Sequence, residues 1–370
     1  MKFDFLVIGA TGMQGRIVTK DLLQNGYSVM LCGRDKSRVV NLLKKYKKTK
    51  FQYLDLRNKN RITKVIKSSG SNVVINCAEG TWNLDVLNSC IESKVHSIDL
   101  GSEIELTKKQ LQKSQALIKN GLIHITGCGS VPGVGNVMLN YAARKFDKIE
   151  DINVGFAWTS NTKDFVVPFS IQSVIWEFTQ PAPIVKLNKV VKVKPLNSIT
   201  EFFYKSIGKE KSFFVTHPET HTFYHYYKDK GLKNVKFYAG FPNHSFEKIE
   251  TMIDLGLGSR EKIRINGVDI VPVEFLTEVL KRIEIPKGYK ENENLWVEIR
   301  NENKRTLMEC LVPTLRGWED AGCNVDTGMP ASIMAQMIKK GIINIPGSYA
   351  PEAIVPPEPF FKELRKRKMV

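Results

Sequence analysis

The stretch FLVIGATGMQGRIVTKDLLQNGYSVMLCGRD, residues 5–35, decides the fold of this chain. Its first four residues form an apolar run typical of a buried strand, residues 13–24 have the periodicity of a helix, and residues 27–32 predict a second strand. A glycine-rich turn, residues 9–15, joins the first strand to the helix. A strand, a GxxGxxG turn, a helix and a strand within about thirty residues predict a dinucleotide-binding unit.

The three glycines of this turn have separate physical tasks. Gly9 permits the tight turn after the strand, Gly12 lets backbone N–H groups approach a pyrophosphate, and Gly15 lets the helix pack close to the strand. The positive end of the helix dipole then faces the phosphates. The alternative is that the glycines only form a turn. We expect the segment to bind a cofactor through Gly9, Thr11, Gly12, Met13, Gln14 and Gly15.

The residues that follow the second strand predict which nicotinamide cofactor is used. An NAD enzyme typically has Asp or Glu there to bind the ribose 2′-OH, whereas an arginine accommodates the 2′-phosphate of NADP. This chain has Gly33 followed by Arg34. We therefore expect NADP(H) as the preferred cofactor, with NAD(H) as the alternative and a merely solvated Arg34 as the other interpretation.

The alternation of strands and helices continues beyond this unit. Residues 51–56, 71–78, 96–101 and 122–129 read as further strands, and helical stretches at 84–93 and 104–119 precede the last two. Repeated β-α units predict a parallel sheet, an α/β Rossmann domain, with ligands beyond the carboxyl ends of the strands. This rule nominates Asp55 near the adenine, Asn76, Cys77 and Ala78 near the nicotinamide, Asp99, and the segment from Cys128 to Gly133.

Length and composition set the class of protein. The chain has 370 residues, of which 42% are hydrophobic and 25% charged, as expected for a soluble protein of two domains. No apolar run approaches the roughly 18–20 residues of a membrane span, and the apolar N-terminal run follows Asp4 and continues into glycines, so it is a strand and not a signal peptide. Cytoplasmic residence is expected. The six cysteines include no CxxC pair, which argues against a disulfide framework or a zinc ribbon.

The formal net charge of +17 raises nucleic acid as a partner. The lysines are dispersed, however, and the two short basic runs, residues 44–50 and 362–368, lie at the end of a predicted helix and at the end of the chain. No helix-turn-helix, zinc-finger or RNP pattern accompanies them. We expect no specific nucleic-acid partner. The basic charge is better explained by a phosphorylated cofactor or by a dicarboxylate substrate. We expect lysines of the second domain to bind the carboxylates of the substrate.

The segment THPETHTFYHYY, residues 216–227, places three histidines four residues apart. On a helix such residues share a face and can share a metal. His217 precedes Pro218, which is tolerated only in the first helical turn, so His217 is expected at the helix cap and away from the shared face. A strand would separate His217 from His225 by about 26 Å. We therefore expect no metal at these histidines. His221 and His225 are expected to form part of an aromatic and polar wall.

With these features in view, the chain resembles the saccharopine dehydrogenase-like family nearly from end to end. The segments that carry the resemblance are GATGMQGR (9–16), VVINCAEGTWNLDVLNSCIESKVHSIDLG (73–101), GCGSVPGVGNVMLNYAARKFD (127–147) and a late segment at 327–364. The resemblance implies a Rossmann domain over residues 1–127, an α+β substrate and dimerisation domain over 128–328, and a C-terminal segment, 329–370, that packs back on the Rossmann domain. It also implies a homodimer and no metal.

The resemblance implies roles for individual residues. Asp99, His217 and Cys128 match catalytic positions, and the substrate is expected to contact Pro132, Gly133, Asn136 and His244. Glu79 and Trp82, unusual residues in the loop after the fourth strand, are further substrate candidates. The chain departs from saccharopine reductases at Val131, where Asp is common, and from lysine 6-dehydrogenases at Gly33-Arg34, where an acidic residue is expected.

The predicted function is that of an oxidoreductase. It transfers a hydride between NADP(H) and a C–N bond of an amino acid, lysine or a saccharopine-like compound, with Asp99 holding the amine and His217 in a second acid–base role. Helix capping is the alternative for both residues, and simple burial is the alternative for Cys128. A catalytically inactive NADP(H)-binding scaffold or redox sensor is the second functional hypothesis.

Overall fold

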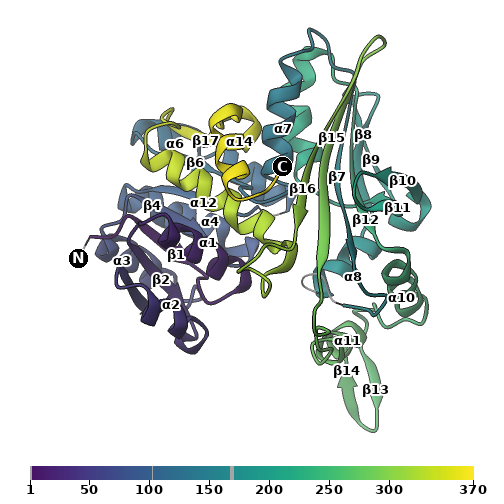
Figure 1. Cartoon of the computed structure of the whole chain (residues 1–370), viewed down its shortest axis with the longest axis horizontal. Helices are drawn as coiled ribbons and strands as arrows, with labels where there is room; N and C mark the ends of the chain where they lie inside the picture. The colour runs from purple at the N-terminus through teal and green to yellow at the C-terminus, as the bar shows by residue number, and fades with distance from the viewer. Residues whose placement is uncertain (1, 102, 167–170) are drawn as a thin grey trace.

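The computed structural model describes residues 2–101, 103–166 and 171–370, arranged as two units built on separate sheets (Figure 1). The N-terminal unit has a seven-stranded sheet in the order β17-β6-β5-β4-β1-β2-β3, in which every pairing is parallel. Its strands are β1 (Phe5–Ile8), β2 (Val29–Gly33), β3 (Thr49–Tyr53), β4 (Val73–Asn76), β5 (His96–Asp99), β6 (Ile123–Ile125) and β17 (Gly347–Tyr349). The four residues of β1 and of β4 are buried, as expected for inner strands covered on both faces.

Helices cover this sheet and connect its strands. They are α1 (Met13–Gln24), α2 (Val40–Lys45), α3 (Lys59–Ser69), α4 (Asn83–Ser93), α5 (Ile104–Leu111), α6 (Ser114–Lys119), α12 (Val325–Lys339), α13 (Pro351–Ile354) and α14 (Pro357–Lys366), with short 3₁₀ turns η1 (Lys36–Val39), η2 (Gly80–Trp82) and η5 (Gly322–Asn324). The helical stretch predicted over 104–119 is helical in the structure but forms two helices. The backbone N–H of Lys113 bonds back to the carbonyl of Gln110, and this tight turn divides the stretch into α5 and α6.

The second unit is a mixed sheet with helices against it (Figure 1). The sheet runs β10-β11-β12-β7-β15-β16, and β8 pairs with β12 and with β9. Its strands are β7 (Asp151–Ser160), β8 (Ala182–Lys186), β9 (Lys189–Val193), β10 (Thr200–Tyr204), β11 (Gly208–Phe214), β12 (Asn234–Phe241), β15 (Glu291–Arg300) and β16 (Arg305–Pro313), with a separate hairpin of β13 (Ile263–Ile265) and β14 (Val268–Ile270). The helices are α7 (Val134–Ala143), α8 (Ile171–Thr179), α9 (Glu219–Tyr227), α10 (Asn243–Asp254) and α11 (Pro272–Leu280), with 3₁₀ turns η3 (Pro195–Ser198) and η4 (Lys228–Lys230). The predicted fold class, an α/β protein with a Rossmann domain and a second α+β unit, is confirmed.

The two units share one hydrophobic core. A single cluster of buried side chains runs from Phe5 on β1 through Met138 on α7 to Phe237 on β12. The C-terminal segment takes part in both units, because β17 extends the parallel sheet and the last residue, Val370, exchanges backbone hydrogen bonds with Leu311 of β16. The N-terminal sheet is therefore completed by residues from the far end of the chain.

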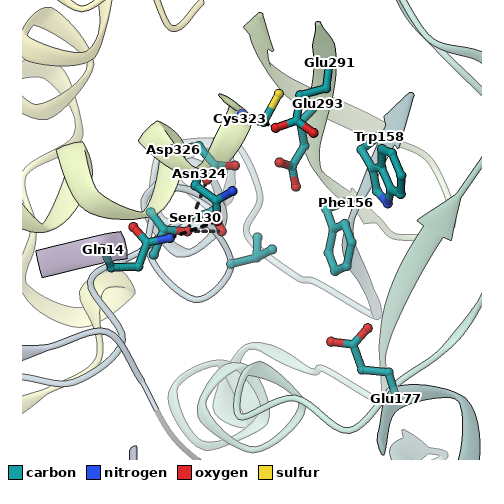
Figure 2. Close-up of a pocket in the computed structure, with 12 residues that line it drawn as sticks. Gln14, Ser130, Phe156, Trp158, Glu177, Glu291, Glu293, Cys323, Asn324 and Asp326 are labelled. Atoms are coloured by element: carbon teal, nitrogen blue, oxygen red, sulfur yellow. Dashed lines mark hydrogen bonds between the residues drawn. The ribbon is translucent and has the colours of Figure 1, made fainter. Parts of the chain in front are cut away.

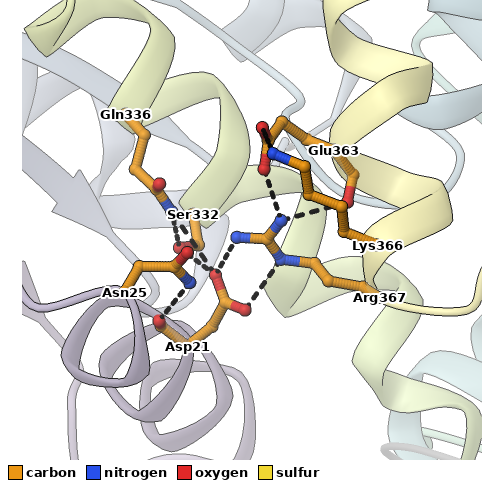
Figure 3. Close-up of polar contacts among 7 residues, drawn as sticks. All are labelled: Asp21, Asn25, Ser332, Gln336, Glu363, Lys366 and Arg367. Atoms are coloured by element: carbon orange, nitrogen blue, oxygen red, sulfur yellow. Dashed lines mark hydrogen bonds and ion pairs between the residues drawn. The ribbon is translucent and has the colours of Figure 1, made fainter.

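A buried ion pair fastens this segment to the first helix (Figure 3). Asp21 of α1 accepts two hydrogen bonds from the Arg367 guanidinium, at 2.8 Å and 2.9 Å, and a third of 2.6 Å from the hydroxyl of Ser332 on α12. Arg367 also donates to the Glu363 carboxylate at 3.0 Å. Side chains 346 positions apart in sequence thus hold α1, α12 and the chain end together.

In the part of the chain that the structure describes, the helices are all too short or too polar to cross a bilayer.

Candidate active site

The glycine-rich turn packs too closely for side chains. Gly9 has φ +75°, and a Cβ there would lie 2.7 Å from the backbone nitrogen of Ala78. A Cβ on Gly15 would lie 2.2 Å from the carbonyl oxygen of Gly9. Gly12 is the N-cap of α1, so the turn presents the helix N-terminus at the carboxyl end of β1. This geometry fits the pyrophosphate of a dinucleotide.

A cavity of about 410 Å³ lies at the carboxyl ends of β1, β2 and β4, beside this turn. We call it the cofactor cradle, and among its lining residues are Gly9, Thr11, Gly12, Gly33, Arg34, Arg38, Asp55, Arg57, Cys77, Ala78, Glu79 and Trp82. Arg34 and Arg38 bring two positive charges to the end of β2, where a 2′-phosphate is expected. Arg38 was not predicted from the sequence as a cofactor-binding residue. It lies four residues beyond Arg34, on the 3₁₀ turn that follows β2.

Asp55 lies in the cradle but is already paired. It accepts hydrogen bonds from the Arg57 guanidinium, the shortest of 2.5 Å, and these bonds hold the pKa of the Asp55 carboxyl at about 2. The carboxylate therefore stays ionised and can accept a hydrogen bond from the adenosine end of a nucleotide. Glu79 and Trp82, expected at the substrate, line the cradle instead, because they sit on the loop that follows β4.

Three residues expected to touch the cofactor are placed elsewhere. The buried Asn76 supports the loop after β4, since its Nδ2 donates to Asn83 at 2.7 Å and its Oδ1 accepts from the backbone of Ala78. Met13 is 41% exposed and is not among the residues that line the cradle. Gln14 turns to a second cavity on the other side of the glycine-rich turn.

The second cavity, of about 220 Å³, lies between the start of α1 and the mixed sheet (Figure 2). Its walls come from several elements: Gln14 of α1, Ser130 and Val131 of the loop before α7, Phe156 and Trp158 of β7, Glu177 of α8, Glu291 and Glu293 of β15, Cys323 and Asn324 of η5, and Asp326 and Thr327 of α12. Four of these residues are carboxylic acids, and none of the described lining residues is Lys or Arg. We call it the acidic cavity.

Three of the carboxyl groups gather at one end of the acidic cavity (Figure 2). Burial raises the pKa of Glu293 well above its usual value, and the neighbouring Asp326 charge adds to the shift. Burial also raises the pKa of Asp326, to about 7, and that of Glu291. One oxygen of Asp326, Oδ2, is buried without a hydrogen-bond partner among the described residues. A cation entering this end would relieve the repulsion among these groups.

The spacing of two glutamates is a sequence signal for this acidic end that the sequence-based prediction did not use. Glu291 and Glu293 stand two residues apart on a strand, so both side chains point to one face. That face is the cavity. Asp326 comes from a helix that begins more than thirty residues later, and Glu177 from a helix before β8, so no local pattern connects them.

Neutral polar groups form the wall nearest the glycine-rich turn. Gln14 Nε2 donates to Asn324 Oδ1 at 3.2 Å, and the Thr327 hydroxyl bonds to that of Ser130 at 3.2 Å. Gln14 Oε1 is buried with no partner among the described residues. The acidic cavity thus has an acidic end and a neutral polar wall beside the cofactor cradle.

Asp99 does not reach either cavity. It is 1% exposed, and its carboxylate accepts hydrogen bonds from the backbone N–H groups of Gly101 and Gly127, the hydroxyl of Thr126 and the amide of Gln110. These contacts tie the ends of β5 and β6 together. The predicted contact between Asp99 and a substrate amine is not supported, because the carboxylate is directed inward.

Cys128 is likewise unsuited to thiolate chemistry. Its side chain is fully buried and donates to the carbonyl of Ile125. Burial, and then the Asp99 charge, raise the pKa of the Cys128 thiol well above its usual value. The alternative interpretation, in which Cys128 is a small buried residue, agrees better with these contacts.

The Pro-Gly turn shapes the cavity without lining it. Gly133 has φ +140°, and its N–H donates to Asn136 Oδ1 at 2.7 Å. Asn136 is buried and in turn donates to Glu352 at 2.7 Å. Pro132, Gly133 and Asn136 therefore fix the loop that carries Ser130 into the acidic cavity, and they are not among the residues that line either cavity.

The three evenly spaced histidines lie in different surroundings. His217 precedes α9, its ring stacks on Phe237 with a centroid distance of 3.9 Å, and its Nδ1 bonds to Glu219 at 2.7 Å. His221 and His225 share one face of α9 with ring centroids 6.0 Å apart. Within the described residues there is no group of three or more His, Cys, Asp or Glu arranged to hold a metal.

His244 was expected at the substrate, and the structure puts it away from both cavities. It is the second residue of α10, in the neighbourhood of Lys163, Asp164 and Lys248. Burial and then the neighbouring lysines lower its pKa. A direct substrate contact for His244 is not supported.

Comparison with known proteins identifies the family. The profile of the saccharopine dehydrogenase NADP binding domain matches residues 5–125, and that of the saccharopine dehydrogenase C-terminal domain matches residues 108–370. The chain belongs to the saccharopine dehydrogenase family. The saccharopine dehydrogenase (L-Glu forming) of Saccharomyces cerevisiae has the same fold, with a TM-score of 0.77 at 13% identity over 99% of this chain and 98% of that one.

Two curated relatives in the family are more similar in sequence. The carboxynorspermidine synthase of Vibrio cholerae is 23% identical over 351 residues, covering 88% of this chain and 82% of its own. The carboxyaminopropylagmatine dehydrogenase of Synechocystis is 23% identical over 295 residues, covering 74% of this chain and 71% of its own.

Membership of the saccharopine dehydrogenase family makes this chain an NADP(H)-binding oxidoreductase that acts on a CH–NH group. The predicted family, enzyme class and cofactor are confirmed. The homodimer and the individual site residues stay predictions.

Replacement of Arg34 by Asp is expected to weaken NADPH binding by roughly 10- to 100-fold, because a charge-assisted contact to phosphate contributes about 1.5–3 kcal/mol. The Kd for NADH, which has no 2′-phosphate, should change little. Titration of intrinsic fluorescence measures both constants. Lys36→Asp is the matched control, since Lys36 is exposed on the 3₁₀ turn that follows Arg34 and does not line the cradle. Equal weakening of both cofactors by Arg34→Asp would contradict the assignment.

Proposed function

We propose that this enzyme reduces the imine formed between an amine substrate with a second cationic nitrogen and a carbonyl compound that carries a carboxyl group. The observation that carries this proposal is the acidic cavity, in which Glu291, Glu293 and Asp326 form one end and no lysine or arginine occurs among the described lining residues. A compound with several carboxylates, such as saccharopine, would be repelled there. An ammonium group would be stabilised.

The relatives support an amine substrate of this class. One is named for carboxynorspermidine and the other for carboxyaminopropylagmatine. Both names denote a carboxylated compound with several nitrogen centres. Lysine carries a carboxylate next to one of its two amino groups, and the acidic cavity would repel that carboxylate. A diamine without the carboxylate therefore fits the acidic cavity better. This favours a polyamine-type substrate over the lysine or saccharopine-like substrate expected from the sequence.

The chemistry follows from the walls of the cavity. An amine and an aldehyde lose water to give an imine, the imine nitrogen takes up one proton, and the addition of one hydride to the resulting iminium carbon then gives a secondary amine. When bound, NADP(H) supplies that hydride. The acidic end holds the distal ammonium, the Phe156 and Trp158 rings pack against the apolar spacer, and the neutral wall of Gln14 and Asn324 faces the reacting carbon. Each group thus positions the substrate beside the cofactor cradle.

A substrate panel tests the proposal. NADPH oxidation, followed by absorbance, is measured with a set of diamines each paired with a short carboxyl-bearing aldehyde, and with lysine paired with 2-oxo acids. We expect the highest kcat/KM with a diamine pair. Turnover confined to lysine with a 2-oxo acid would contradict the amine class, and tight NADPH binding without any turnover would favour the inactive scaffold.

The pH dependence of KM is a second test. The Glu293 and Asp326 carboxyls have raised pKa values, that of Asp326 about 7, because both are buried. Below that pH they take up protons, lose their negative charge and bind an ammonium less well. The KM for the diamine is therefore expected to rise as pH falls from 8 to 6, while the Kd for NADPH stays constant. A KM that falls over this range would contradict the role of this acidic end.

Replacement of Glu293 by Gln is expected to raise the KM for the diamine by about 10- to 100-fold, since a hydrogen bond to a charged group contributes about 1.5–3 kcal/mol. The Kd for NADPH should stay within a factor of two, because Glu293 does not line the cradle. Glu302→Gln, a change of the same charge on an exposed loop, should leave KM unaltered. An unchanged KM in Glu293→Gln would exclude this carboxyl as the ammonium partner.

A further inference from the structure

Glu177 is the one carboxyl group of the acidic cavity that lies apart from the others (Figure 2). It projects from α8 toward the cavity, below Phe156, while Glu291 and Glu293 lie at the opposite end. Its Oε2 is buried and has no hydrogen-bond partner among the described residues. A buried carboxyl oxygen without a hydrogen-bond partner lowers the stability of the folded state, unless a bound molecule supplies the missing hydrogen bond.

A histidine and a second carboxyl stand behind Glu177. His217 acts on Glu177 through its charge, and its Nδ1 bonds at 2.7 Å to Glu219, whose side chain is fully buried. The His217 ring is held flat against Phe237 and is itself 19% exposed. Glu177 therefore lies on the cavity wall within electrostatic reach of His217, and the buried Glu219 carboxylate holds the partly exposed imidazole.

We propose that Glu177 is the catalytic acid that protonates the imine nitrogen, and that the His217–Glu219 pair restores its proton. This inference rests on the proposed function. Glu177 faces the cavity with an oxygen that has no hydrogen-bond partner among the described residues, and the apolar Phe156 ring lies between it and the other carboxyl groups. His217 is a positioning residue, which holds a proton near Glu177 through its bond to Glu219.

The step balances in atoms and charge. The neutral imine nitrogen takes the proton of the Glu177 carboxyl, and the resulting iminium carbon accepts a hydride from NADPH to give the secondary amine and NADP⁺. Glu177 is left as a carboxylate. A proton then passes from His217 to Glu177, and solvent returns one to the imidazole.

The local charges keep Glu177 in the form that this step needs. Burial raises the pKa of Glu177 to about 8, although the His217 charge acts in the opposite direction. Burial lowers the pKa of His217, but the Glu219 carboxylate more than offsets this, so the pKa of His217 is raised. The other titratable groups of the cavity, Glu291, Glu293, Asp326 and Cys323, line the end away from α8. At neutral pH Glu177 is protonated and able to donate.

Replacement of Glu177 by Gln tests the inference, because Gln keeps the shape and removes the proton. At saturating diamine, aldehyde and NADPH, kcat is expected to fall by about 100-fold or more, the usual contribution of a general acid. The fall of wild-type kcat above about pH 8 should disappear in this variant. His217→Gln should move that fall to higher pH, since a positive charge beside Glu177 is lost, and His225→Gln, on the exposed face of α9, should change nothing.

The outcomes separate this inference from the proposed function. Wild-type enzyme with no turnover of any amine contradicts the proposed function. Wild-type turnover together with full kcat and an unchanged pH profile in Glu177→Gln overturns the role of Glu177 alone. If Glu177→Gln does not bind NADPH, Glu177→Asp decides: a lower kcat that still falls at high pH supports the acid, and a wild-type kcat overturns it.

Discussion

Replacement of Gly15 by Ala is expected to weaken NADPH binding by roughly 30- to 100-fold. A Cβ at this position would lie 2.2 Å from the Gly9 carbonyl oxygen and 2.6 Å from the Ala10 Cα, and both are backbone atoms that cannot turn aside. The turn and the N-terminus of α1 must therefore separate. Overpacking of this kind costs about 1–3 kcal/mol, and it falls on the groups that hold the pyrophosphate.

The helix propensity of alanine opposes the loss expected for Gly15→Ala, so this prediction is a strict test of the clash. In a helix, Gly→Ala ordinarily stabilises by about 0.5–1 kcal/mol, so any loss must come from the clash. Gly121→Ala is the control. It has φ +67° and open space around it, so it should cost about 1 kcal/mol of stability and leave the Kd for NADPH unaltered. Fluorescence titration with NADPH and thermal unfolding of both variants measure these effects. An unchanged Kd in Gly15→Ala would show that the turn does not hold the cofactor.

The dinucleotide-binding unit was predictable because its determinants are local. Strand, turn and helix follow one another within residues 5–24, and the spacing of Gly9, Gly12 and Gly15 is dictated by backbone contacts inside that segment. The same holds for Arg34, which follows β2 directly. The late strand β17 was not predicted, because a strand of three residues carries no periodic signal.

The acidic cavity could not be predicted, because its groups come from distant parts of the chain. Glu177, Glu293 and Asp326 are brought together only when α8, β15 and α12 pack around one space. The net charge of +17 even pointed toward a substrate bearing carboxylates. The four carboxylic acids that line this cavity are negative groups in a chain of positive net charge, so the overall charge was a poor guide to the charge of the cavity.

The strand-end rule predicts an edge of the sheet and leaves open where each side chain at that edge points. Asp99 ends β5, as the rule requires, yet its carboxylate turns inward to bind the backbone of Gly101 and Gly127. Which way a side chain points at a strand end depends on the neighbouring loop, and that loop's path is set by tertiary contacts. From the sequence one can therefore predict which residues end the strands, and not which of their side chains face a cavity.

Replacement of Arg367 by Met is expected to destabilise the protein by about 3–5 kcal/mol, the usual cost of leaving one member of a buried ion pair alone. The Arg367 and Asp21 side chains are 8% and 4% exposed, and the guanidinium donates two hydrogen bonds to the Asp21 carboxylate (Figure 3). Without it, Asp21 keeps the bond from Ser332 but no positive charge. Thermal unfolding should show a midpoint lower by at least about 5 °C.

Two further variants decide whether charge or packing is responsible. Lys366→Met removes a neighbouring cation whose pairing with Glu363 is at the surface, so it should cost less than about 1 kcal/mol. Asp21→Leu combined with Arg367→Met removes both charges and should recover much of the stability lost in Arg367→Met, since an apolar pair leaves no charge buried. If the double variant is no more stable than Arg367→Met, the loss comes from the packing of the arginine stem. The clamp between α1 and the chain end would then be steric, and Asp21 would stabilise the structure mainly through Ser332 of α12.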